Sequence, residues 1–453
     1  MSTAQILITV IAGVSLLLIM VLKFKISAFI SLLVSSMLVG ILSGMPLEDI
    51  LVSIQEGMGG TLGFVAVVVG LGAIFGQILE SSGGAESLAH YLVKKFGTDR
   101  ASWAMVLTGF IVAIPVFLDV GLVILAPILY ALSRDTKRSL LYYGIPLLAG
   151  LAVTHSFMPP TPGPIAVSDI LEAQLGWVIF FGFLLGLPTA IIAGPIFGKY
   201  IAGKINIQPP EDMIQPQADK ESNPEKLPSF RSIALLIAVP LVLILVNTFT
   251  SVLVDKGIFP KTLLTDILIF LGHPFSALII AALLAVYFLG IRRGKSRQEL
   301  LDLSNKALGP AGIIILVTGA GGVLKQILVD SGIGEMMAQS ISDSALPPIL
   351  LAWILAAIVR VTQGSATVAM ITAAGIMAPV LSFINPSDPE LALIVISIAS
   401  GATLLSHVND SGFWLVSKYF GMDEKQTLRS WTMMESIIAL CGLAFTMLAS
   451  LFV

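Results

Sequence analysis

Long apolar segments separated by short polar stretches make up most of this sequence. A transmembrane helix needs about 20 consecutive apolar residues. Full crossings are predicted where apolar segments approach or exceed that length: residues 6–22, 26–43, 60–79, 140–170, 175–201, 232–254, 263–290, 308–329, 391–417 and 431–452. The pattern therefore predicts an all-α polytopic membrane protein.

Two further apolar stretches, 102–133 and 347–384, have polar or helix-breaking residues at their centres. The first contains Pro115 and Asp119, and the second contains Arg360. Each half of these stretches has about 16 residues, which is short for a full crossing. We expect both to be re-entrant hairpins whose tips are buried in protein, because lipid cannot satisfy broken backbone.

The composition agrees with this fold class and excludes several functions. Hydrophobic residues make up 56% of the chain and charged residues 12%, whereas a soluble domain carries about 25% charged residues. No basic patch with interleaved aromatics occurs, so nucleic acid is not an expected partner. The single cysteine, Cys441, excludes an intrachain disulfide and a CxxC metal or redox site. The Gly-rich stretches carry no GKS or GKT that would support a nucleotide site, and no cofactor or metal is expected.

The distribution of basic residues predicts the topology. Residues 6–22 are followed by Lys23 and Lys25, the reverse of a signal peptide, so we expect a first transmembrane helix. If the chain starts outside and crosses at every full span, nearly all loop lysines and arginines lie on the cytoplasmic side. Only Lys256 and Lys261 fall clearly outside. Both termini are therefore expected outside.

A polar stretch divides the chain into two halves. Residues 205–231 are rich in Pro, Gln, Glu and Lys and have no apolar periodicity. We expect a flexible cytoplasmic linker there, between a membrane unit at 1–204 and another at 232–453.

The two halves contain similar segments. GLGAIFGQILESSGGAE at 70–86 and GAGGVLKQILVDSGIGE at 319–335 are identical at eight aligned positions. In the expected topology the first runs inward and the second outward. We therefore expect two inverted-topology repeats, each with about five transmembrane helices and one re-entrant hairpin, an arrangement typical of alternating-access transporters.

Two of the full spans are interrupted by polar or helix-breaking residues. The first carries four prolines between Pro159 and Pro164, which cannot continue a helix. The second contains the polar run SHVNDSG at 406–412. Broken helices expose carbonyls and helix-terminal amides near the midplane, where helix N-termini attract anions such as carboxylates.

Charged residues at these places are functional candidates, because charge is costly inside a membrane. Asp119 is either a proton or cation site or a cap for the amides at the hairpin tip. Asp410 is a second candidate for proton coupling. Arg360 either clamps a substrate carboxylate through paired donors or forms a structural ion pair with Asp119 or Asp410.

Polar residues at the same breaks and tips are candidates for substrate binding. His155 and His407 align between the halves and either brace the unwound chain or relay protons. The remaining candidates could bind a polyol or its carboxylate: Thr154, Thr161, Gly163, Thr362, Gln363, Ser365, Ser406 and Asn409.

Four segments resemble the gluconate:proton symporter family of bacterial permeases, within the wider ion transporter superfamily. They are IPVFLDVGLVILAPI at 114–128, THSFMPPTPGP at 154–164, RVTQGSATVAM at 360–370 and SHVNDSGFW at 406–414. The resemblance covers the whole chain. It implies proton-coupled uptake of gluconate or a related sugar acid across the bacterial inner membrane, two hairpins meeting at the substrate site, and a homodimer. Some relatives take D-serine or other small hydroxy acids.

Other functions remain open at this point. A sodium-coupled carboxylate transporter is the close rival, since broken helices also suit that ion. A channel should show a continuous polar stripe, whereas polar residues here lie at discrete breaks. An intramembrane enzyme should show a nucleophile–base or metal set, and no HExxH or GxSxG motif occurs.

Overall fold

The computed structural model describes residues 3–210, 227–333 and 346–453, and they form helices joined by turns. The helices of the first half are α1 (Thr3–Leu22), α2 (Ala28–Leu42), α3 (Leu47–Ser81), α4 (Gly84–Phe96), η1 (Thr98–Arg100), α5 (Ala101–Val112), α6 (Leu118–Thr136), α7 (Leu141–Phe157), α8 (Pro162–Ile170), α9 (Leu175–Ile191), η2 (Ile192–Ile196) and α10 (Phe197–Ala202). Those of the second half are α12 (Phe230–Asp255), α13 (Leu263–Gly272), α14 (Pro274–Ala285), η4 (Val286–Gly290), η5 (Ile291–Arg293), α15 (Arg297–Asp330), α17 (Pro348–Gln363), α18 (Ala366–Ile384), α19 (Asp388–Gly401), α20 (Ser411–Phe420), α21 (Glu424–Thr427), η6 (Leu428–Thr432) and α22 (Met433–Ala449).

The structure confirms an all-helical polytopic membrane protein. In the described ranges, 8 helices are long and apolar enough to cross a membrane. They are Leu47–Ser81, Leu141–Ile170, Leu175–Ala202, Phe230–Asp255, Pro274–Arg293, Arg297–Asp330, Ala366–Ile384 and Glu424–Ala449. Within the expected linker 205–231, residues 211–226 lie outside the described residues, as does Glu335 of the second similar segment.

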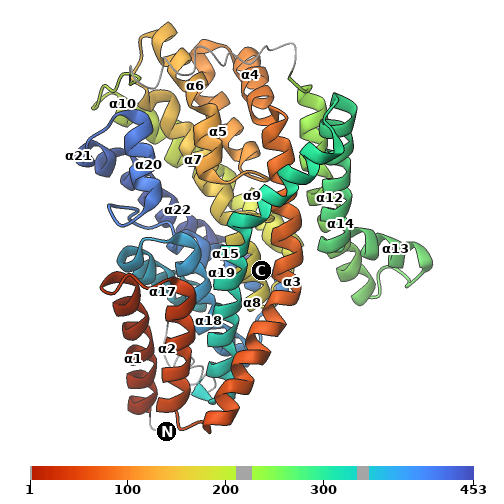
Figure 1. The fold of residues 1–453 in the computed structure, drawn as a ribbon, viewed down its shortest axis with the longest axis vertical. Coiled ribbons are helices and arrows are strands. Elements are labelled where there is room, and N and C mark those ends of the chain that lie inside the picture. The colour runs from red at the N-terminus through yellow and green to blue at the C-terminus, as the bar shows by residue number, and fades with distance from the viewer. Residues whose placement is uncertain (1–2, 211–226, 334–345) are drawn as a thin grey trace.

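Two long helices, α3 and α15, pack against each other through the molecule (Figure 1). The crossings predicted at 60–79 and 308–329 are shorter than the helices that contain them. Helix α3 has 35 residues and α15 has 34. The apolar pattern marks only the part of a helix inside the lipid. A 35-residue helix is about 52 Å long, and a capping box of Ser296 and Glu299 starts α15 well before its apolar segment.

The expected single crossing at 263–290 is wrong, because the chain is broken at His273. Pro274 disfavours helical backbone at the residue before it and cannot donate a helical hydrogen bond. Helix α13 therefore ends at Gly272, and α14 starts at Pro274 with His273 as its N-cap. Figure 1 shows α13 projecting from the edge formed by α12 and α14.

Four interruptions lie where the sequence contains helix-breaking or polar runs. They separate α5 from α6 at 113–117, α7 from α8 at 158–161, α17 from α18 at 364–365, and α19 from α20 at 402–410. Gly364 ends α17 with a φ of 86°, a backbone conformation that favours glycine. A Cβ at this residue would also overlap the carbonyl oxygen of Asn409, so glycine allows the two breaks to touch.

Glycines allow α5 and α7 to pack with their backbones in contact. A Cβ at Gly109 would overlap the carbonyl oxygen of Leu147 on α7, and a Cβ at Gly150 would overlap that of Val106 on α5. Such contacts between small residues are a main source of helix association in membranes. The contacts at Gly109 and Gly150 hold α7 against α5. The break at 158–161, which follows α7, therefore lies close to the pair of helices α5 and α6.

We predict that Gly150→Leu destabilises the protein by about 1–3 kcal/mol or more, because the new side chain must separate α5 from α7. Thermal unfolding in detergent measures this loss. Gly312→Leu is the matched control, since a Cβ at Gly312 on α15 meets nothing within 4 Å. Equal unfolding temperatures for the two variants would contradict the close backbone packing.

Candidate functional site

The interruptions surround a cavity of about 620 Å³. Its wall includes residues of α6, α7, α8, α15, α17, α18, α20 and α22, so both halves of the chain contribute. Seven of the candidates from the sequence line it: Asp119, His155, Arg360, Gln363, Ser365, Asn409 and Asp410. The cavity therefore brings together candidate residues as far apart in the sequence as Asp119 and Asp410.

Four helices begin at the cavity wall. The lining includes Leu118 and Asp119 at the start of α6, Pro162 at the start of α8, residues 365–367 at the start of α18 and residues 411–412 at the start of α20. Each helix N-terminus has free amide groups and a partial positive charge. Together they make the cavity favourable for an anion.

A buried ion pair joins α17 to the start of α20. The Arg360 Nη2 lies 2.6 Å from the Asp410 Oδ2, and the two side chains are 3% and 14% exposed. The Arg360 Nη1 donates to the carbonyl oxygen of Gly364. Of the two ion pairs considered from the sequence, the structure therefore has the one with Asp410. It leaves the Arg360 Nε buried and without a partner among the described residues.

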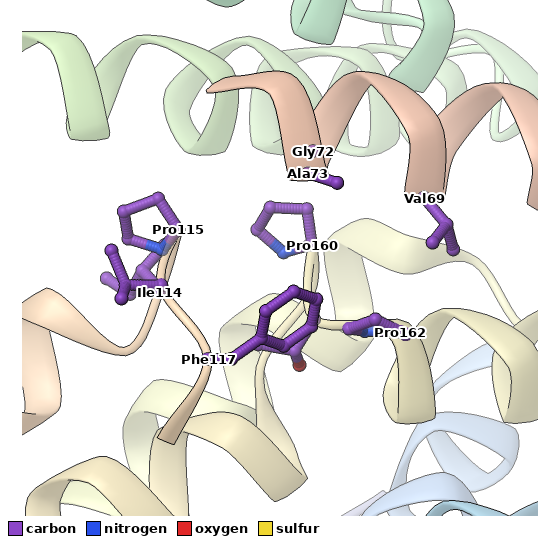
Figure 2. Close-up of a pocket in the computed structure, with 10 residues that line it drawn as sticks. Val69, Gly72, Ala73, Ile114, Pro115, Phe117, Pro160 and Pro162 are labelled. Atoms are coloured by element: carbon purple, nitrogen blue, oxygen red, sulfur yellow. The ribbon is translucent and has the colours of Figure 1, made fainter. Parts of the chain in front are cut away.

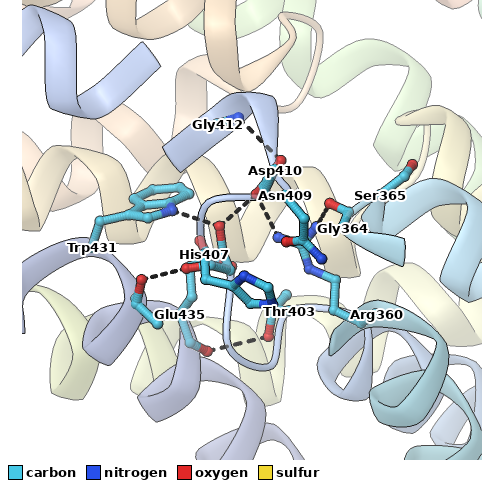
Figure 3. Close-up of polar contacts among 12 residues, drawn as sticks. Arg360, Gly364, Ser365, Thr403, His407, Asn409, Asp410, Gly412, Trp431 and Glu435 are labelled. Carbon is cyan, nitrogen blue, oxygen red and sulfur yellow. Dashed lines mark hydrogen bonds and ion pairs between the residues drawn. The ribbon is translucent and has the colours of Figure 1, made fainter. Parts of the chain in front are cut away.

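Other donors fix Asp410 in place (Figure 3). The Ser406 hydroxyl donates to Asp410 Oδ2 at 2.5 Å, and the Gly412 amide donates to Oδ1 at 3.0 Å. Asp410 is thus the N-cap of α20 as well as the partner of Arg360. Ser406 in turn accepts a 2.7 Å hydrogen bond from the Trp431 Nε1. The segment between α19 and α20 is therefore attached to both α17 and η6, the short helix before α22.

The two aligned histidines have different surroundings. The His407 Nε2 lies 2.9 Å from the carbonyl oxygen of Val361, so this ring braces the 402–410 segment against α17. His155 lines the cavity, and its buried Nδ1 has no partner within the described part of the chain. Phe117 packs edge-on against the His155 ring, with centroids 6.1 Å apart.

Asp119 is exposed at the cavity wall at the start of α6. In the part of the chain that the structure describes, no side-chain hydrogen bond caps this helix. The structure therefore does not show the capping role that the sequence left open for Asp119.

Unpartnered polar atoms concentrate in this cavity. Within the described residues, 7 buried side-chain nitrogen or oxygen atoms lack a hydrogen-bond partner. Five of them belong to residues that line the cavity: His155 Nδ1, Arg360 Nε, Gln363 Oε1, Asn409 Oδ1 and Glu435 Oε1. Buried polar atoms are normally paired, so these atoms are free to bind a polar ligand.

Several predicted site residues do not line the large cavity. The Thr154 hydroxyl donates to the Phe110 carbonyl at 2.9 Å, and the Thr362 hydroxyl donates to the Ile358 carbonyl of its own helix at 2.8 Å. Gly163 packs against Met370, where a Cβ would lie 2.8 Å from the Met370 sulfur. Ser406 and His407 brace the 402–410 segment. These residues support the site rather than face it.

Thr161 lies at a second, much smaller cavity of about 20 Å³ beneath α3 (Figure 2). Pro115 and Pro160, from the first two interruptions, approach α3 here near Gly72. A Cβ at Gly76 would overlap the Pro115 carbonyl oxygen, so α3 lies directly on the broken chain. The volume suits a single water molecule rather than a substrate.

The sequence interpretation missed Glu435, Trp431 and Thr403, all of which line the cavity. Glu435 lies on α22 and is 4% exposed. An acid within the apolar segment 431–452 is the same signal that singled out Asp119. Across residues 3–210, 227–333 and 346–453, no group of three or more His, Cys, Asp or Glu side chains could hold a metal ion.

Comparisons with known proteins agree over nearly the whole chain. The family model described as GntP family permease matches residues 5–452. The low-affinity gluconate transporter of Escherichia coli is 41% identical over 449 residues, covering 99% of each chain. The Gnt-II system L-idonate transporter of the same organism is 38% identical, covering 96% of this chain and 97% of that one. The solved YdaH transporter of Alcanivorax borkumensis shares the fold, with a TM-score of 0.59, 14% identity and 88% coverage of each chain.

We predict that Asp410→Ala destabilises the protein by about 3–5 kcal/mol, because it leaves the Arg360 charge buried and unpaired. The double variant Arg360→Met/Asp410→Ala should lose less than the sum of the two single variants. Thermal unfolding in detergent gives all three values. Simple additivity would mean that the two side chains do not stabilise each other.

Proposed function

This chain belongs to the GntP family of permeases, and we propose that it imports gluconate or a related small sugar acid by proton symport. The observation that carries the proposal is the cavity of about 620 Å³, where four helix N-termini meet five unpartnered polar atoms, one of them the Arg360 Nε. Its volume lies within the usual range for small-molecule sites. Permeases carry solutes across membranes without chemical conversion, so the chain is a transporter and not an enzyme.

The polar groups suit a hydroxylated carboxylate. We place the carboxylate at the free Nε edge of Arg360, near the starts of α18 and α20, where charge-assisted hydrogen bonds are strongest. Gln363 Oε1 and Asn409 Oδ1 can then accept hydrogen bonds from substrate hydroxyls. The names of the relatives, gluconate and L-idonate transporters, support a six-carbon sugar acid.

The arrangement of the helices supports the proposed inverted repeats, 1–204 and 232–453. Long helices α3 and α15 carry the two similar segments and pack together. Broken helices α7–α8 and α19–α20 occupy corresponding places, as do the interrupted pairs α5–α6 and α17–α18. We propose that these two pairs are re-entrant hairpins, although α18 alone is long enough for a crossing, and that 205–231 is the cytoplasmic linker.

Membrane placement and assembly complete the proposal. The positive-inside pattern supports both termini outside the bacterial inner membrane. Exposed apolar side chains on α13, such as Leu263, Leu264 and Phe270, are compatible with lipid or with a second copy in a homodimer.

Labelled gluconate uptake into proteoliposomes under an inward proton gradient tests the function. We expect accumulation that does not require sodium and is not inhibited by unlabelled D-serine. Uptake that requires sodium would show that sodium, and not the proton, is the coupling ion. If the protein takes up D-serine strongly but not gluconate, the proposed substrate is wrong and is a small hydroxy acid instead.

We predict that Gln363→Leu raises the KM for gluconate about 2–10-fold, the effect of losing one hydrogen bond of about 0.5–1.5 kcal/mol. Thr362→Val is the matched control, because that neighbouring hydroxyl is bonded within its own helix and does not line the cavity. Initial uptake rates over a range of gluconate concentrations give both values. A larger effect at Thr362 than at Gln363 would place the substrate on the other face of α17.

A further inference from the structure

Glu435 is the most deeply buried acid in the cavity wall. It lies on α22, is 4% exposed, and lines the cavity beside Trp431. Its Oε1 is buried without a hydrogen-bond partner among the residues the structure describes. The Glu435 carbonyl, but not its carboxyl group, accepts a 3.4 Å hydrogen bond from Thr403. The carboxyl group therefore faces the cavity without a fixed partner.

The charged and titratable groups around Glu435 come from four elements. Arg360 on α17 and Asp410 at the start of α20 both act on it electrostatically. Asp119 on α6 and His155 on α7 are the other titratable groups in the same wall. Arg360 does not neutralise Glu435, because its Nη1 and Nη2 are bonded to Gly364 and Asp410.

A carboxylate at Glu435 would thus be a buried charge with no bonded counter-ion among the described residues, which is unfavourable in a low-dielectric interior. A protonated carboxyl group is neutral and can donate a hydrogen bond into the cavity. We propose that Glu435 carries the coupled proton: it is protonated when the anionic substrate binds, and it releases the proton when the substrate leaves. This inference rests on the proposed proton symport.

The two other acids of the cavity are less suited to this role. Asp410 already accepts hydrogen bonds from Arg360, Ser406 and Gly412, so its two carboxyl oxygens are occupied by three donors. Asp119 is exposed at the cavity wall, so it is not a buried charge. Of the three acids, only Glu435 is buried with no ion pair and no hydrogen-bond donor on its carboxyl group among the described residues.

Charge explains how the proton and substrate would be coupled. An ionised Glu435 repels a substrate carboxylate placed at Arg360 and competes with Asp410 for the guanidinium. Protonation removes both effects, so the proton and the anion favour each other's binding, and by linkage the effect is reciprocal. Trp431, one helical turn before Glu435, holds Ser406 of the 402–410 segment. Glu435 therefore lies on the same side of this helical segment as Trp431, which holds the 402–410 segment through Ser406.

Glu435→Gln, which imitates the protonated side chain, separates coupling from binding. In proteoliposomes we expect the variant to exchange internal for external gluconate within about twofold of the wild-type rate, and to lose accumulation driven by a proton gradient. Wild-type gluconate affinity should fall by up to about tenfold per pH unit as the pH rises, whereas that of the variant should not change. Glu56→Gln, at an exposed glutamate of α3, is the matched control and should keep gradient-driven accumulation.

A second measurement does not depend on the substrate. Infrared difference spectra between neutral and alkaline pH should show the carbonyl stretch of a protonated carboxylic acid in the wild type and Glu56→Gln, and its loss in Glu435→Gln. A band that persists unchanged in Glu435→Gln, or gradient-driven accumulation by that variant, would overturn the inference. Failure of the wild type to transport gluconate while the band is lost in Glu435→Gln would overturn the proposed substrate and leave the proton site standing.

Discussion

The ion pair between Arg360 and Asp410 is the interaction on which the cavity depends. It joins the end of α17 to the start of α20 across a distance of 50 residues in the sequence. Burying two charges costs free energy that their attraction recovers only with good geometry and further hydrogen bonds. Gly364, Ser406 and Gly412 supply those bonds. Through Gly364 and Asp410, Arg360 therefore positions the starts of α18 and α20 at one cavity. Its Nε keeps no partner among the described residues.

Broken helices provide the rest of the site, and each half breaks its helices by different means. In the first half, prolines remove donors, so α7 ends before Pro159 and α8 starts at Pro162. In the second half, Gly364 turns the chain and Asp410 caps α20. Both solutions place helix N-termini at the cavity, where backbone amides attract an anion without placing several basic side chains in the membrane.

Much of this could be predicted from the sequence, because polar residues and prolines stand out in apolar segments. That contrast located the four breaks, Arg360, Asp410 and Asp119. It could not show that Thr362 faces away while Gln363 faces the cavity, since neighbouring residues on a helix point in different directions. It also underestimated α3 and α15, whose ends are polar. Glu435 was missed because its segment has no helix breaker beside it, although its charge alone was a sufficient signal.

The two histidines that align in the sequence have different surroundings in the structure. His407 is bonded to Val361 and braces the chain, whereas His155 has an unpartnered nitrogen at the cavity. Side-chain hydrogen bonds from Trp431 and Asn409 tie the second-half break to other helices. Prolines and packing against α3 shape the first, where the Thr154 and Thr161 hydroxyls bond nearby backbone carbonyls. Hydrogen bonds respond to a change of charge, and proline geometry does not. In the proposed symport, binding of a proton and an anion would therefore act mainly on the hydrogen bonds of the second half.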